Sequence, residues 1–185
     1  MLMYESLLVK HCAPTLAGMK TGSLFGCTFP SFCELTECMR QWNRLLTPKG
    51  LRAIPARYRD GKAMIYVYRP ARLSEDLQND TAQQLLRERG YCAGNSDCCV
   101  ARLMRRLCES GEFPHEVGLF LSYPPEDVKG FIDHRANGFK CAGLWKVYGD
   151  EAKAQALFAK FKKCTEIYCA LWQTGSKLEQ LAVAV

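Results

Sequence analysis

A histidine and a cysteine stand side by side near the start of the chain, at His11 and Cys12. A thiolate is a strong nucleophile, and an imidazolium neighbour or a helix N-terminus can lower the pKa of a cysteine enough to populate it near pH 7. Adjacent residues on a helix point roughly 100° apart, so the two side chains need not touch. The pair therefore predicts either a reactive thiol or a buried cysteine beside a helix-terminal histidine.

A second pair, His115 and Glu116, directly follows Pro114. Proline favours the first position of a helix, which would place both residues in a first turn where the helix dipole stabilises a carboxylate and keeps an imidazole neutral. In that interpretation His115 is a general base and Glu116 orients it. In the alternative, His115 only bonds to a loop carbonyl. The position four residues after His115 is Leu119, so the segment lacks the second histidine of a zinc peptidase.

Two further sets of residues offer places for an anion. Lys20 lies in a glycine-spaced segment, 18–26, whose loop amides could form a nest for phosphate. Residues 51–70 carry five Lys or Arg and one Asp, which is four of the net charge of +6. Arg57 and Tyr68 in this segment could grip and stack a nucleotide-like ligand, or simply belong to a solvated sheet face.

Two basic residues close predicted strands beside aromatic side chains, at Arg69 and Lys146. Each either anchors an anion or stacks on its aromatic neighbours. Metal chemistry has no local motif, because no Cys-x-x-Cys occurs and the pairs Cys33/Cys38 and Cys164/Cys169 are five residues apart. The sequence predicts no metal site within one short segment, and it identifies no cofactor.

The elements that position these residues begin with a hairpin. Asp60-Gly61 is typical of a type I′ turn, so strands are expected at 53–58 and 62–68, joined by a third strand at 140–148. Alternation then predicts a basic, tyrosine-bearing surface opposite the core. Its members are Arg57, Arg59, Lys62, Met64, Tyr66 and Tyr68.

Helical periodicity and capping signals account for most of the remaining chain. The expected helices are 4–12, 31–46 with Ser31 as N-cap, 73–78, 80–89, about 95–108, 114 to about 122, one opened by Pro125, and 150–172. The glycine-spaced segment 18–26 is expected to be a loop. These elements predict an α+β fold, mostly helical with a small antiparallel sheet, as one domain over residues 1–185.

Composition favours a cytoplasmic protein. No stretch approaches the roughly 20 apolar residues that a membrane span needs, and no secretory leader precedes the 11 cysteines. The thiols are therefore expected to be reduced and mostly buried. Outside residues 51–70 the charge is close to balanced, which disfavours nucleic acid as a partner.

Two sequence blocks, His11–Gly18 and Phe113–Val128 followed by Gly143–Tyr148, resemble a family of uncharacterised proteins from anaerobic Gram-positive bacteria. The match covers nearly the whole chain. One departure is Ser122, where that family is expected to favour glycine. The resemblance implies a bacterial cytosolic protein and supplies no activity, so the chemistry rests on the residues themselves.

The leading hypothesis is a protein that binds a small anionic ligand, or a thiol-dependent enzyme, with a pocket where His11-Cys12 and His115-Glu116 meet. Cys12 would be the nucleophile or redox thiol, and Lys20 and Arg69 the anion anchors. The alternative is a non-catalytic regulatory or interaction module that uses the basic sheet face to bind an acidic partner. Substrate, cofactor and oligomeric state are not indicated.

Overall fold

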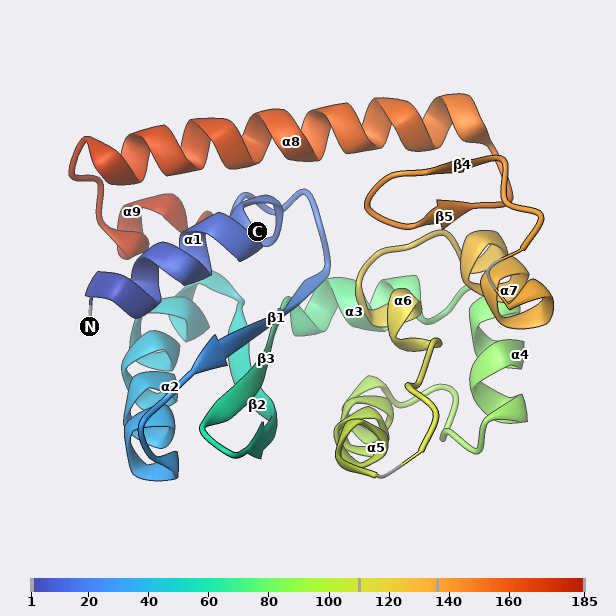
Figure 1. Ribbon diagram of the computed structural model, residues 1–185, viewed down its shortest axis with the longest axis horizontal. Coiled ribbons are helices and arrows are strands. Elements are labelled where there is room, and N and C mark those ends of the chain that lie inside the picture. The colour runs from blue at the N-terminus through green and yellow to red at the C-terminus, as the bar shows by residue number, and fades with distance from the viewer. Residues whose placement is uncertain (1, 110, 136, 185) are drawn as a thin grey trace. The chain divides into compact units, whose positions relative to one another are not determined.

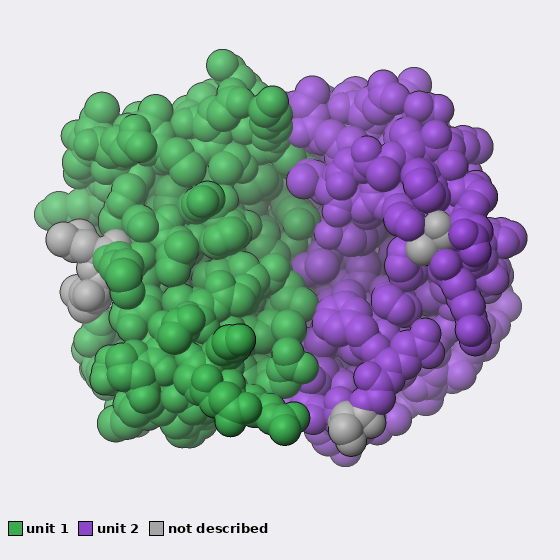
Figure 2. Space-filling view, viewed as in Figure 1, with its two compact units in different colours: residues 1–71, 161–185 green, residues 72–160 purple. Residues whose placement is uncertain are grey.

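The computed structural model describes residues 2–109, 111–135 and 137–184 and confirms the α+β class (Figure 1). The chain divides into two compact units, coloured separately in Figure 2. Unit 1 consists of the residues up to Ala71 and from Phe161 onward, and unit 2 of Arg72–Lys160. That the two units behave as one domain over 1–185 stays a prediction.

A three-stranded antiparallel sheet in the order β1-β3-β2 forms the centre of unit 1. Its strands are β1 (Gly22–Thr28), β2 (Arg52–Arg59) and β3 (Lys62–Tyr68). The predicted hairpin is confirmed, because Arg59 pairs with Lys62 and the turn residues Asp60 and Gly61 have φ of 51° and 74°, as a type I′ turn requires. A bulge between Pro55 and Arg57 shifts the register along the rest of β2.

The prediction for the third strand is wrong. The third strand of the sheet is β1, which pairs with β3 and lies largely in the segment expected to be a glycine loop. Residues 140–148 instead form a hairpin of their own, β4 (Cys141–Ala142) with β5 (Lys146–Val147). The chain turns between them at Gly143, where a Cβ would lie 2.3 Å from the Phe158 ring, so only glycine fits this turn. Local patterning cannot choose which segment occupies an open strand edge.

The predicted basic surface lacks its tyrosines. Arg57 and Lys62 are exposed, but Tyr66 and Tyr68 are 0% and 3% exposed and stack on each other with ring centroids 4.6 Å apart. Because β3 is the central strand, it is buried on both faces over residues 65–68, and strict alternation of core and solvent fails there.

The core of unit 1 forms where α1 (Leu2–Leu16) and α2 (Phe32–Leu46) pack on the sheet and α9 (Leu178–Leu181) packs on both helices. Ser31 caps α2 as predicted, its hydroxyl accepting from Glu34 N at 3.1 Å. The short 3₁₀ turn η1 (Thr47–Lys49) follows α2. The largest fully buried members of this core are Leu8, Leu16, Phe29, Leu35, Trp42, Leu46, Leu51 and Ile65.

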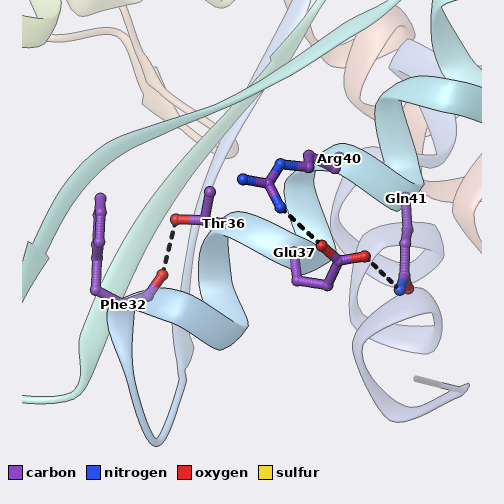
Figure 3. A network of polar contacts seen from close by, with 5 residues as sticks. All are labelled: Phe32, Thr36, Glu37, Arg40 and Gln41. Atoms are coloured by element: carbon purple, nitrogen blue, oxygen red, sulfur yellow. Dashed lines mark hydrogen bonds and ion pairs between the residues drawn. The ribbon is translucent and has the colours of Figure 1, made fainter.

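The other side of α2 carries a polar network, drawn in Figure 3. The Glu37 carboxylate accepts from Arg40 Nη1 and from Gln41 Nε2, each at 3.0 Å, and the Thr36 hydroxyl donates to the Phe32 carbonyl at 2.8 Å. Pairs three or four residues apart stabilise a helix by a few tenths of a kcal/mol each. The network therefore supports the helix and places no functional group.

Unit 2 is mostly helical, with α4 (Asp80–Glu88), α5 (Ser96–Cys108), α6 (Val117–Phe120), α7 (Pro125–His134) and all but the first two residues of α3 (Pro70–Asp76). Helix α8 (Glu151–Gln173) begins in unit 2 and ends in unit 1. Within the described residues, no helix combines the length and apolar character needed to cross a membrane.

Asp127 fixes the β4–β5 hairpin to α7. Its buried carboxylate accepts from Trp145 Nε1, Tyr148 N and Gly149 N, each at 2.7 Å. A carboxylate that accepts several short hydrogen bonds holds its partners in one geometry. The hairpin is therefore a structural part of unit 2.

Candidate functional site

The structure places Cys12 and His11 on α1 in unit 1, in different environments. Cys12 is 0% exposed, and burial raises the pKa of its thiol to about 12. His11 is exposed and stacks on Phe25 with ring centroids 5.2 Å apart. A protonated thiol without solvent access is not a nucleophile at neutral pH. Cys12 and His115 belong to different units, so neither unit by itself brings them together.

Arg69 is buried in unit 1 and holds backbone carbonyls. Its guanidinium donates to Thr15 O at 2.9 Å, Leu16 O at 2.8 Å, Val183 O at 2.8 Å and Lys49 O at 3.2 Å. The first two carbonyls end α1, where a cation is favoured by the helix dipole. This arrangement gives Arg69 a structural task and leaves little of its donor capacity for an anion.

The remaining proposed ligand-binding residues are scattered. Lys20 is half-buried in unit 1, where burial lowers its pKa to about 8. Arg57 is exposed on β2, and Tyr68 is buried against Tyr66. In unit 2, the Lys146 ammonium lies 4.6 Å from the centroid of the Phe139 ring, a cation–π contact with a different ring from the adjacent Trp145 and Tyr148 of the stacking alternative. None of these four residues lines the cavity that holds His115 and Glu116.

His115 and Glu116 lie in a turn before α6, and the predicted helix start is wrong. The turn does begin at Pro114, whose carbonyl accepts from Val117 N at 3.0 Å, but α6 has only four residues and ends at Phe120. Ser122 then adopts φ of 60°, a left-handed conformation that favours glycine, so the chain makes a tight exit there. So short a helix provides no useful dipole for tuning His115 or Glu116.

Glu116 is the centre of a buried charge cluster. The residue is 0% exposed, and its Oε1 accepts from Arg106 Nη1 at 2.5 Å and from the Tyr91 hydroxyl at 2.8 Å. Its Oε2 lies 4.0 Å from Arg89 Nη1 and makes no hydrogen bond with any described residue. Burial, and then the neighbouring Glu116, raise the pKa of Tyr91, so this hydroxyl stays a donor. A buried carboxylate needs such partners, and here it bonds Arg106 directly and attracts Arg89 from 4.0 Å.

These arginines line a cavity of about 300 Å³ in unit 2, which we term the arginine pocket. Its charged lining is Arg89, Arg106, Arg135, Glu112 and Glu116. The three guanidinium groups outnumber the two carboxylates, and the volume suits a molecule of modest size. An excess of guanidinium donors around a small cavity favours an anion.

Aromatic side chains also line the arginine pocket. His115 makes an edge contact with Phe131, with ring centroids 4.8 Å apart, and a tilted contact with Phe113 at 5.9 Å. Its Nε2 lies 3.9 Å from Glu112 Oε1, so the carboxylate nearest to this ring nitrogen is Glu112 and not the predicted Glu116. The two aromatic rings fix the imidazole at the edge of the pocket, where it can meet a ligand.

Sequence reasoning found His115 and Glu116 and missed Arg89, Tyr91 and Arg106. The two arginines stand at or near the ends of α4 and α5, where basic residues are common for dipole reasons alone. Nothing local distinguishes them from other surface arginines. The available signal was conditional: if Glu116 is buried, its carboxylate needs cationic partners.

The described parts of the chain hold no group of three or more His, Cys, Asp or Glu side chains that could bind a metal ion. Comparison with protein-family models matches residues 8–182 to a family described as a protein of unknown function, DUF3793. No curated protein and no solved structure matches the chain.

Proposed function

The chain belongs to the DUF3793 family, whose description assigns no function, and we propose from its residues that unit 2 binds a small anionic molecule in the arginine pocket. Two finer expectations remain proposals beside it. The sequence blocks imply a bacterial protein from an anaerobe, and the composition implies a cytoplasmic one with reduced thiols.

The observation that carries the proposal is the burial of Glu116 beneath two half-exposed arginines. The side chains of Arg106 and Arg89 are 21% and 30% exposed, while that of Glu116 is 0% exposed. The carboxylate holds the Arg106 guanidinium at 2.5 Å and lies 4.0 Å from that of Arg89, and a guanidinium has five N–H donors in a fixed fork. The arginines are thus oriented in advance, which lowers the entropic cost of gripping an anion.

The excess charge of the site supports the same conclusion. Arg89 Nε is buried and makes no hydrogen bond within the described protein, so this guanidinium is not saturated by its protein partners. Arg135 adds a third cation, whereas the second acid, Glu112, is 79% exposed and therefore well screened by water. The charged side chains that line the pocket therefore carry a net positive charge.

Binding is favoured over thiol catalysis. Cys12 is buried with a raised pKa, and no cysteine lines the arginine pocket. His115 lines the arginine pocket and can donate a ring N–H to a bound anion. The rival interaction module loses support, since the tyrosines of its basic face are buried.

Calorimetric titration of the full chain with phosphate, pyrophosphate and citrate tests the proposal. At least one of these anions should bind. Arg106→Met should lower the affinity for that anion by about tenfold or more, the scale of one lost charge-assisted hydrogen bond. The matched control is Arg87→Met, because Arg87 is exposed on α4 and donates to Gln83 at 2.6 Å.

Two results would contradict the proposal. One is that none of the three anions binds at low ionic strength. The other is that Arg87→Met weakens binding as much as Arg106→Met, because a diffuse surface charge and not the arginine pocket would then account for the affinity. Circular dichroism of each variant checks that unit 2 remains folded, since Arg106 also neutralises the buried Glu116.

A further inference from the structure

The loop between α4 and α5 carries two accessible thiols that touch. Among the 11 cysteines only four are buried, which corrects the expectation that most would be. Cys92 is exposed and Cys98 is half-buried, and their thiols share a hydrogen bond. Free cysteines usually serve as buried apolar side chains, so an accessible pair in mutual contact is a different situation.

The local chain holds the two sulfur atoms together. Asn95, which caps α5, accepts from Cys98 N at 2.9 Å through its side chain and donates its own N–H to Cys92 O at 3.3 Å. The Cys99 thiol donates to the same Cys92 carbonyl at 3.4 Å. Gly94 turns the loop with φ of 104°, a conformation that other residues rarely adopt. The pair is therefore preorganised within a seven-residue segment.

We propose that Cys92 and Cys98 form a redox-active dithiol that exchanges with small-molecule disulfides. The Cys92 thiolate attacks one sulfur of the disulfide RSSR, which forms a Cys92 mixed disulfide and releases RS⁻. The Cys98 thiol then loses its proton and attacks the Cys92 sulfur, which forms the Cys92–Cys98 disulfide and releases a second RS⁻. Both thiolates leave as RSH after taking up the two protons of the dithiol, so RSSR is reduced and the protein oxidised.

The assignment of roles follows from exposure and hydrogen bonding. Cys92 is the more accessible sulfur and meets the incoming disulfide first. The hydrogen bond with Cys92 raises the pKa of Cys98, so the Cys98 thiol keeps its proton until the mixed disulfide on Cys92 has formed. Cys99 is buried, and burial raises the pKa of its thiol to about 11, so it does not compete.

The test uses the reduced full chain and glutathione disulfide, with free thiols alkylated before digestion. Trypsin cuts after Arg89 and Arg102, so one peptide contains all three cysteines of the loop. In the protein without substitutions, the mass of this peptide should fall by two hydrogens. The amount of the Cys92–Cys98 disulfide should exceed that of the Cys92 mixed disulfide by about tenfold, because an intramolecular thiol acts at millimolar effective concentration or above.

Three variants make the outcome decisive. Cys98→Ser should trap glutathione on Cys92, and Cys92→Ser should abolish the cross-link. Cys33→Ser removes an exposed thiol on α2, outside the loop, and should leave the yields of the Cys92–Cys98 disulfide and of the Cys92 mixed disulfide unchanged. The proposal is overturned if the native protein accumulates the Cys92 mixed disulfide, or if fragment masses place the bond at Cys99. It is also overturned if Cys33 becomes modified faster than Cys92.

Discussion

Replacing Arg69 should reveal how much one buried guanidinium contributes to unit 1. Arg69 is 2% exposed and donates to four carbonyls, which join the end of α1, the turn η1 and the C-terminal segment. Arg69→Met removes every donor and the charge, whereas Arg69→Lys keeps the charge but replaces the planar fork by a single ammonium group. The two variants separate the geometry of the side chain from its charge.

The size of the effect follows from the fate of each carbonyl. Thr15 O also accepts from Gly18 N at 3.2 Å, and Leu16 O from Val183 N at 3.0 Å, so these two keep a partner after substitution. The carbonyls of Lys49 and Val183 lose their guanidinium donor, and a hydrogen bond from a charged donor contributes about 1.5–3 kcal/mol. Removing a buried charge gives back part of its desolvation cost, so the lower value applies to each.

We therefore expect Arg69→Met to lower the free energy of unfolding by about 3 kcal/mol, and Arg69→Lys by about 2 kcal/mol because one ammonium cannot reach four separated carbonyls. Urea unfolding followed by circular dichroism measures both. Arg57→Met is the matched control, since Arg57 is exposed on the same sheet and should change stability by less than about 0.5 kcal/mol. Finding Arg69→Lys within that margin of the native protein would refute the reasoning.

Two other predictions concern the turn and the buried thiols. Gly61→Val should lower the free energy of unfolding by about 1–2 kcal/mol, because Gly61 has φ of 74°; an unchanged urea midpoint would contradict this. Burial raises the pKa of Cys12 from 9.0 to about 12, so the unfolded chain ionises first and the stability that Cys12 contributes below pH 9 is lost as the pH rises toward 12. Urea unfolding at pH 8 and pH 10 measures the fall in the free energy of unfolding, which should be larger for the native protein than for Cys12→Ala by about 1.4 kcal/mol for each pH unit above 9. Equal losses in the two proteins would show that Cys12 is not buried as described.

Local signals were reliable where neighbouring residues decide the outcome. Asp60-Gly61 gave the hairpin and its register near the turn, Ser31 gave the start of α2, and Asn95 was among the predicted caps of α5. In each case a side chain or a backbone dihedral bonds within three residues, so no distant part of the chain is needed.

The candidate site was only half visible for the opposite reason. His115 and Glu116 stood out by type and spacing, yet the role of Glu116 depends on Arg89, 27 residues earlier, and on Arg106, ten residues earlier. A partner at such a distance is chosen by how α4 and α5 pack. The same holds for Cys12, because its burial depends on tertiary packing. Burial raises the pKa of the Cys12 thiol to about 12, which argues against the hypothesis that Cys12 is a nucleophile.

The sequence by itself determined the α+β class, the hairpin, most helix positions and the two residues around which the arginine pocket is built. Only the tertiary structure decided that β1 pairs with β3, that Tyr66 and Tyr68 are buried, and that the guanidinium of Arg69 holds carbonyls. The physical reason is that turns and caps are short-range hydrogen-bonding choices, whereas strand order, burial and charge pairing are set by which surfaces exclude water together.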